Sequence, residues 1–219
     1  NARDRSHVNR RTWLIIVAIV VVLTFGFGFR LYNMGRDISA ENGGQTSSSG
    51  VATIGGPFNL VDQNGKARTE QDFRGDYMLI YFGYTYCPDV CPTELQAMSN
   101  AMDILPADVA KKVQPIFVSV DPERDTVAAM ADYVPHFHPR MLGLTGTLEQ
   151  TSAAARAYRV YYSKAFEEGE PKDSDTYLVD HSSFIYLMGP NGAYIRHFNY
   201  GETPEKIAEG IEKVVANQG

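Results

Sequence analysis

The chain has 219 residues, of which 44% are hydrophobic and 21% are charged, and its net charge is −6 at neutral pH. These values suit one globular domain with an appendage, and no heptad pattern or internal repeat suggests a coiled coil or a repeat array. Residues 1–36 contain six arginines and one aspartate, which leaves the remainder with a net charge of −11. Such an acidic remainder argues against nucleic acid and anionic lipid surfaces as partners.

The first expected element is a transmembrane anchor over residues 13–32. This segment begins and ends with an aromatic residue, its only charge is Arg30, and its length matches one bilayer crossing. Phenylalanines follow the apolar run where a cleaved signal peptide has small residues, so an uncleaved anchor is favoured. Arginines are more numerous before the segment than after it, which places residues 1–12 in the cytoplasm and the remainder outside.

A tether and a folded domain are expected to follow the anchor. Residues 33–52 are polar and rich in glycine and serine, which is typical of a flexible linker. The folded domain is therefore expected over residues 53–219. Its first element is a hairpin over residues 58–66, where an Asn-Gly pair is flanked by strand-like residues.

Strands and helices then alternate along the chain. Strands are expected at 77–82, 113–120, 142–145, 183–188 and 194–199, and helices at 93–105, 126–134, 147–158 and 203–215. The second helix is expected to be capped near Asp125, and the long polar stretch 162–177 to be a surface insertion. This order predicts an α/β fold with a partly parallel sheet. With a cysteine pair before the first helix, the pattern resembles the thioredoxin fold.

The two cysteines, Cys87 and Cys91, stand between an expected strand and an expected helix. A helix N-terminus favours the thiolate, so this is a place for thiol chemistry. A purely structural disulfide is disfavoured because its closed loop would be very small. Two possibilities remain: a dithiol–disulfide couple, or a soft metal site such as trigonal copper(I), which needs a third ligand. Zinc would normally require four ligands.

The third ligand of a metal site would have to be one of five histidines. His7 lies beyond the expected anchor, His136 and His138 are expected on a surface loop, and His197 is expected to pack within the last strand or at its edge. His181 stands where the long polar loop enters a strand. In a thioredoxin-like sheet this loop faces the cysteine turn, which makes His181 the candidate ligand.

Five collinear segments resemble the Sco/SenC/PrrC family of copper-binding cytochrome oxidase assembly proteins, namely 86–92, 119–126, 143–147, 156–163 and 180–192. The resemblance implies a thioredoxin-like fold with an added N-terminal hairpin and a surface insertion. It also implies that Cys87, Cys91 and His181 bind one copper ion, as Cu(I), Cu(II) or both. Residues 119–126 are expected to support this site from the neighbouring strand.

The function implied by the resemblance is that of a membrane-anchored copper metallochaperone. Its expected recipient is the dinuclear copper site of cytochrome c oxidase subunit II or another oxidase assembly factor, and its expected donor is another copper chaperone. The expected location is the bacterial inner membrane with the C-terminal domain in the periplasm. In a eukaryote it would be the mitochondrial inner membrane, with the domain facing the intermembrane space.

Other functions remain possible on the same cysteines. A thiol–disulfide reductase that keeps the target's cysteines reduced, or a redox sensor, needs Cys87 and Cys91 but not His181. A peroxidase is disfavoured: Cys91 stands in a peroxiredoxin-like Cys-Pro-Thr-Glu, but Pro88 and Tyr84 occupy the places where that motif has threonine and proline. An interaction module with a vestigial site is disfavoured because all three candidate ligands are present.

Overall fold

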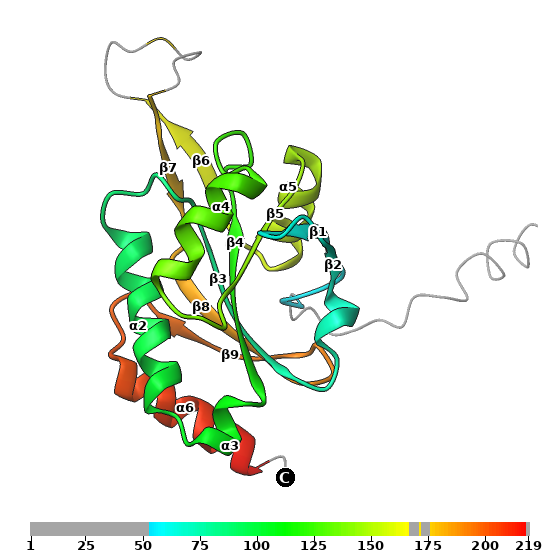
Figure 1. Ribbon diagram of the computed structural model, residues 1–219, viewed down its shortest axis with the longest axis vertical. Helices are drawn as coiled ribbons and strands as arrows, with labels where there is room; N and C mark the ends of the chain where they lie inside the picture. Colours follow the sequence, from blue (N-terminus) through cyan, green and yellow to red (C-terminus); the bar gives the residue numbers. More distant parts are fainter. Residues whose placement is uncertain (1–52, 167–170, 172–175, 218–219) are drawn as a thin grey trace, which may run out of the picture. The chain divides into compact units, whose positions relative to one another are not determined.

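The computed structural model describes residues 53–166, 171 and 176–217. Within them, a seven-stranded sheet has the order β2-β1-β5-β4-β3-β8-β9 (Figure 1). Its strands are β1 (Asn59–Asp62), β2 (Ala67–Thr69), β3 (Tyr77–Gly83), β4 (Val113–Ser119), β5 (Leu142–Thr145), β8 (Phe184–Met188) and β9 (Tyr194–Asn199). The pairs β3–β4 and β4–β5 are parallel, and the other pairs are antiparallel.

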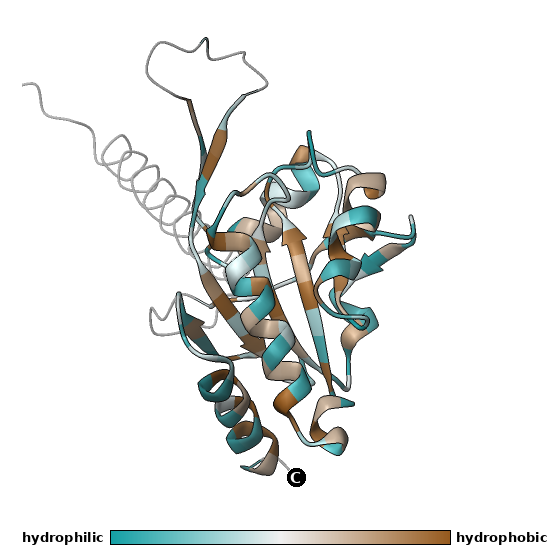
Figure 2. Ribbon diagram, turned by 60° about the vertical axis from the view of Figure 1, so that its left-hand side comes forward, coloured by the Kyte–Doolittle hydropathy of each residue, from teal (hydrophilic) through white to brown (hydrophobic). Residues whose placement is uncertain are grey.

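The central strands are apolar because both of their faces are covered. All seven residues of β3 are buried, and β4 pairs with it in register from Tyr77 opposite Val113 to Gly83 opposite Ser119. Continuous apolar runs of this kind are typical of strands buried inside a partly parallel sheet. Figure 2 shows this hydrophobic colouring concentrated on the strands at the centre of the domain.

The helices are α2 (Val90–Ile104), α3 (Ala107–Ala110), α4 (Val127–Tyr133), α5 (Leu148–Ala157) and α6 (Pro204–Asn217), with 3₁₀ turns η1 (Glu70–Phe73) and η2 (Val134–His136). Close approaches at two glycines show which strands α4 and α6 cover. A Cβ atom on Gly143 in β5 would lie 2.5 Å from Val134, at the end of α4, and one on Gly210 in α6 would lie 2.7 Å from Phe198 in β9.

The predicted mixed α/β order and the N-terminal hairpin are confirmed. Strands β1 and β2 pair from Asn59 opposite Thr69, and β1 also pairs antiparallel with β5, so the hairpin extends the main sheet. The predicted anchor and tether, residues 13–52, lie outside the described residues. In the described part of the chain no helix combines the length and the apolar character needed to cross a bilayer.

Two predicted helix starts are wrong. Helix α2 begins at Val90 rather than at residue 93, so Cys91 belongs to its first turn. Pro92 is tolerated there because the first-turn N–H that it lacks would have no partner inside the helix. Helix α4 is capped by Thr126, whose hydroxyl accepts a hydrogen bond from the N–H of Ala129. Asp125, the predicted cap, is fully buried instead.

The predicted surface insertion contains the beginning of a second, two-stranded sheet. Strands β6 (Tyr162–Ala165) and β7 (Leu178–His181) pair antiparallel, from Tyr162 opposite His181 to Ala165 opposite Leu178 (Figure 1). We refer to this pair as the β6–β7 ribbon. Only Val179 of its eight residues is buried and most of the other seven are polar, so they lack the apolar alternation by which a strand is recognised in sequence.

Candidate metal centre

The cysteine half of the candidate site is built on the buried core. Cys91 is completely buried in the first turn of α2, where it faces the end of β3. A Cβ atom on Gly83 would lie 2.7 Å from the Cys91 Sγ, so only glycine leaves room for this sulfur. Cys87 is partly exposed in the preceding loop, and its Sγ accepts a hydrogen bond of 3.3 Å from the N–H of Cys91.

The two thiols have opposite acidities. The pKa of Cys87 lies well below its usual range because the Cys91 thiol donates a hydrogen bond to it, helped by the N–H groups of Cys91 and Asp89. The pKa of Cys91 is raised because this same hydrogen bond and its burial favour the protonated thiol. At neutral pH the pair therefore carries one thiolate, on the more exposed sulfur.

The histidine half comes from the end of β7. The Nε2 of His181 lies 3.2 Å from the Sγ of Cys91, and its Nδ1 lies 3.1 Å from the carbonyl oxygen of Ser182. Because a carbonyl can only accept, Nδ1 donates its proton to Ser182, which leaves Nε2 as the nitrogen that faces the cysteines. This arrangement is common for histidines that bind metals, since the second hydrogen bond fixes the ring.

The donor set suits one soft ion. The ligand atoms of Cys87, Cys91 and His181 all lie within 4.8 Å of one another. Metal bonds of roughly 2.0–2.3 Å allow two ligand atoms on one ion to lie up to about 4.6 Å apart, so small side-chain movements are sufficient. Two sulfurs and one imidazole fit copper(I) best by softness. A cavity of about 460 Å³ opens beside these ligands, lined also by Tyr84, Leu178 and Tyr200.

Two tyrosines at the end of β3 complete the surroundings of the ligands. The buried hydroxyl of Tyr81 lies 3.8 Å from the Cys91 Sγ and 3.1 Å from the Oγ of Ser183. The rings of Tyr81 and Tyr84 meet the His181 ring edge to face, with centroids 6.0 and 5.9 Å away. Neither tyrosine was predicted from the sequence as part of the site. The signal that could have found them is their place in and just after the apolar strand that leads into the cysteine loop.

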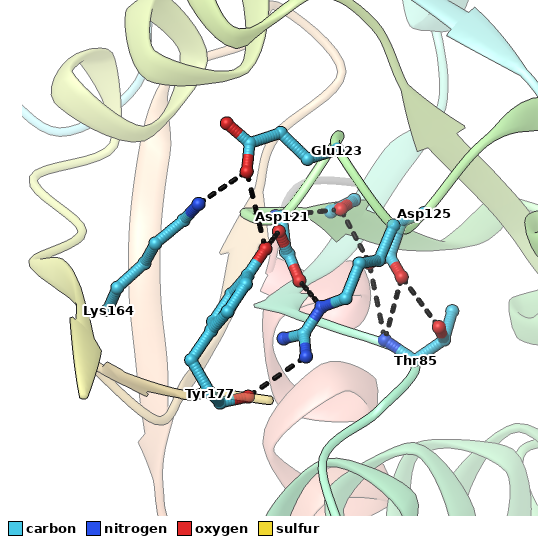
Figure 3. Close-up of polar contacts among 8 residues, drawn as sticks. Thr85, Asp121, Glu123, Asp125, Lys164 and Tyr177 are labelled. Atoms are coloured by element: carbon cyan, nitrogen blue, oxygen red, sulfur yellow. Dashed lines mark hydrogen bonds and ion pairs between the residues drawn. The ribbon is translucent and has the colours of Figure 1, made fainter. Parts of the chain in front are cut away.

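Residues 119–126 contact the cysteine loop, as predicted. Both the N–H and the hydroxyl of Thr85 donate hydrogen bonds to the Asp125 carboxylate, which also accepts one of 2.6 Å from Ser119 (Figure 3). Burial raises the pKa of Asp125. This carboxylate therefore joins the start of the cysteine loop to the end of β4.

The structure separates the other described histidines, His136, His138 and His197, from the cysteines, whereas His7 and the rest of residues 1–12 lie outside the described residues. His136 is exposed in η2, as predicted. His197, on the edge strand β9, packs against Phe184 of β8, which agrees with the predicted packed or edge position. The surface position predicted for His138 is wrong: its side chain is buried, and its Nδ1 accepts a hydrogen bond from the N–H of Arg140. Burial lowers the pKa of His138.

Comparisons with known proteins agree with this fold and donor set. The sequence model of the SCO1/SenC family matches residues 46–216. The chain belongs to the SCO1/SenC family. A similar relative is "Protein SCO2 homolog, mitochondrial" of Bos taurus, which is 42% identical over 94% of this chain and 76% of its own length.

Two solved SCO1/SenC structures carry copper. ScoI of Arabidopsis thaliana, solved with copper bound, is 42% identical, has a TM-score of 0.67, and covers 75% of this chain and 99% of that one. ScoI of Bradyrhizobium japonicum, also solved with copper bound, is 44% identical, with a TM-score of 0.65, and covers 73% of this chain and 98% of that one. The predicted thioredoxin-like Sco fold is thereby confirmed.

Proposed function

We propose that this chain is a copper metallochaperone that binds one copper ion through Cys87, Cys91 and His181. The observation that carries the proposal is the convergence of two sulfurs and one imidazole nitrogen within 4.8 Å, in a family with copper-bound members. The ion is the cargo of the protein, and its recipient is the dinuclear copper site of cytochrome c oxidase subunit II. Another copper chaperone would supply the ion.

The ligands would engage the cargo in unequal ways. Cys87 offers a thiolate at neutral pH, whereas Cys91 has to lose a proton when the metal binds. His181 offers its Nε2 lone pair without a proton cost in the tautomer set by Ser182. Thiolates suit Cu(I), and the imidazole extends the site to Cu(II). Because Cys87 and His181 line the cavity, a recipient's ligands can replace them one at a time.

The same proposal includes the arrangement at a membrane. Residues 13–32 would anchor the chain, residues 33–52 would be a tether, and residues 53–219 would hold the copper outside the cytoplasm, with residues 1–12 inside it. The location would be the bacterial inner membrane or, as the mitochondrial relatives suggest, the mitochondrial inner membrane. A tethered domain would meet other proteins of the same membrane without leaving it.

Copper titration of the reduced full chain tests the proposal. Cu(I) is added in competition with a chelator of known affinity, and one equivalent is expected to bind tightly. His181→Ala is expected to weaken binding, whereas His136→Ala, an exposed histidine away from the cysteines, is expected to leave it unchanged. Failure of the reduced chain to bind one equivalent, or unchanged binding by the His181→Ala variant, would contradict the proposal.

A second candidate, a thiol–disulfide reductase, is favoured by the unequal thiols. The partly exposed Cys87 thiolate would attack a target disulfide, form a mixed disulfide and release one target thiolate. The Cys91 sulfur, after losing its proton, would then attack Cys87, release the second target thiolate and leave a Cys87–Cys91 disulfide. Two electrons pass to the target. Rescue of oxidase assembly by His181→Ala separates the functions, since full rescue favours the reductase and loss favours copper delivery.

A further inference from the structure

The two halves of the metal centre come from different parts of the fold, so something has to align them. Cys87 and Cys91 lie where β3 meets α2, whereas His181 ends β7, in a ribbon that belongs to a separate sheet. On one side His181 is joined to β8 of the main sheet by Ser182 and Ser183, and on the other its position depends on the contacts between this ribbon and the main domain. Figure 3 shows a polar cluster at this junction, between the segment that follows β4 and the residue that precedes β7.

Arg124 contacts Tyr177, at the entrance to strand β7 of the ribbon. Its Nη1 donates a hydrogen bond of 2.9 Å to the carbonyl oxygen of Tyr177, the residue directly before β7. Its guanidinium also lies 3.7 Å from the centroid of the Tyr177 ring. The Arg124 side chain is 16% exposed and the Tyr177 residue 8%, so water competes little with these contacts.

Asp121 closes this contact into a ring of three residues. Its Oδ2 accepts a hydrogen bond of 2.5 Å from the Arg124 Nε, and its Oδ1 accepts one of 2.8 Å from the Tyr177 hydroxyl. The carboxylate is 2% exposed. Both of its oxygens are therefore used to hold the guanidinium and the tyrosine in one geometry, which a flexible ammonium could not reproduce.

The same guanidinium also contacts the cysteine side. It lies 4.9 Å from the ring centroid of Tyr86, the neighbour of Cys87, and 5.7 Å from that of Tyr84. Tyr84 in turn meets the His181 ring edge to face. The Arg124 guanidinium therefore lies close to three tyrosine rings. Tyr86 is next to Cys87, Tyr84 packs on His181, and Tyr177 directly precedes β7.

We propose that Arg124, held by Asp121, is a positioning residue that aligns His181 with Cys87 and Cys91. This inference rests on the proposed copper function, but it concerns a contact made by the metal-free protein. Arg124 acts through His181, so its replacement weakens histidine ligation and leaves the two sulfurs in place. Arg124→Lys keeps the charge but loses the planar fork that joins Asp121 to Tyr177. Tyr177→Phe keeps the ring and the backbone carbonyl but removes the hydroxyl that donates to Asp121 at 2.8 Å and to Glu123 at 3.4 Å.

A matched control is available in the same cluster. The exposed pair of Glu123 and Lys164 also joins the segment after β4 to the ribbon, and its side chains are 52% and 40% exposed. Ion pairs of this kind are screened by water and contribute little. Glu123→Gln therefore removes the charge of one link between the same two segments. It keeps an oxygen that can accept the 3.4 Å hydrogen bond from the Tyr177 hydroxyl and removes no hydrogen bond of Arg124, so it is expected to leave copper binding unchanged.

The test uses the full chain and two readouts. Arg124→Lys is expected to lower the copper affinity about tenfold, which is typical for loss of an outer-shell partner. In the electron paramagnetic resonance spectrum of the Cu(II)-loaded chain, it is expected to weaken the coupling to the His181 nitrogen. Without copper, the amides of Val179 and His181 are expected to exchange hydrogen about tenfold faster, with those of β3 and β4 unchanged. Tyr177→Phe is expected to shift both readouts in the same direction by less.

A double-variant cycle separates positioning from general stabilisation. In the His181→Ala background, Arg124→Lys is expected to cause no further loss of copper affinity, because its effect passes through the missing ring. Additive losses of copper affinity in the double variant would overturn the proposal. So would an equal increase of amide exchange in β3, β4 and β7, or unchanged copper affinity and amide exchange in both Arg124→Lys and Tyr177→Phe. If the unaltered chain bound no copper, the proposed function would fail, while amide exchange in β7 would still decide the role of Arg124.

Discussion

Cys91 and His181 lie 3.2 Å apart, yet their surroundings differ in almost every respect. Cys91 is completely buried, belongs to the first turn of α2 and fits against a glycine in the central strand. His181 is half buried, ends a ribbon in which only Val179 is buried, and depends on contacts from another segment for its position. One half of the site is therefore fixed by the core, and the other half can be displaced at small cost. The proposed function, in which the protein both holds and releases an ion, would use this difference.

The largest expected effect comes from breaking the buried half. Cys91→Ser exchanges a soft ligand for a hard one, so Cu(I) affinity should fall by more than the roughly 10- to 100-fold that is typical for loss of an outer-shell partner. Chelator competition measures the change. Ser99→Ala, a buried serine of the same helix, is the control and should bind copper normally. Retention of tight binding by Cys91→Ser would remove Cys91 from the ligand set.

Breaking the displaceable half should cost less. His181→Ala is expected to lower copper affinity by about 100-fold and to leave the thermal stability of the metal-free protein nearly unchanged, since the ring is half buried. Calorimetry and chelator competition measure the two quantities. A large loss of thermal stability in the metal-free variant would show that His181 is part of the core, which would contradict the difference between the buried Cys91 and the displaceable His181.

The close packing around Cys91 can be tested separately from its ligand role. Gly83→Ala would place a methyl group 2.7 Å from the Cys91 sulfur and 3.0 Å from the Tyr81 ring, so the protein should lose about 1–3 kcal/mol of unfolding free energy. Denaturant titration measures this loss. Gly56→Ala, whose Cβ would approach only Ala157, at 3.3 Å, should cost less. Equal costs would show that the sulfur is not tightly enclosed.

The smallest expected effect concerns the acidity of Cys87. Because its folded pKa is depressed, its thiolate is present above that pKa and is lost only as the pH falls through it. Alkylation of Cys87 by iodoacetamide should therefore be nearly as fast at pH 6 as at pH 8, with Cys91 protected by burial. In Cys91→Ala the hydrogen bond from the Cys91 thiol to Cys87 is gone. The pH profile of Cys87 alkylation should then move toward the ordinary cysteine pKa of about 8.5. An unchanged profile in that variant would contradict the assigned cause.

The sequence predicted the buried half of the molecule better than the ribbon. Strand β3 was recognisable because every residue from Tyr77 to Phe82 is apolar, and the Asn-Gly pair marked the first hairpin. The start of α2 was misplaced by three residues, since Pro92 looks like a boundary when it is in fact accommodated in the first turn. The ribbon strands β6 and β7 were missed because strands of mostly polar, unburied residues have no apolar alternation.

The candidate ligands were also predictable, but their support was not. Cys87, Cys91 and His181 could be named from residue type, spacing and the expected fold, and the structure brings them together. The contact of Arg124 with Tyr177 joins residues 53 positions apart and depends on side-chain orientation, which no periodic pattern encodes. The same holds for Asp125, whose position suggested a helix cap but whose carboxylate is turned inward to Thr85 and Ser119.

X-ray absorption of the full chain loaded with one equivalent of Cu(I) tests the central claim most directly. The fine structure counts the sulfur and nitrogen atoms bound to the metal. The geometry of Cys87, Cys91 and His181 predicts two sulfurs and one imidazole nitrogen, with the nitrogen lost in His181→Ala. A spectrum with fewer than two sulfurs, or one that is identical in the His181→Ala variant, would contradict the assignment of this site.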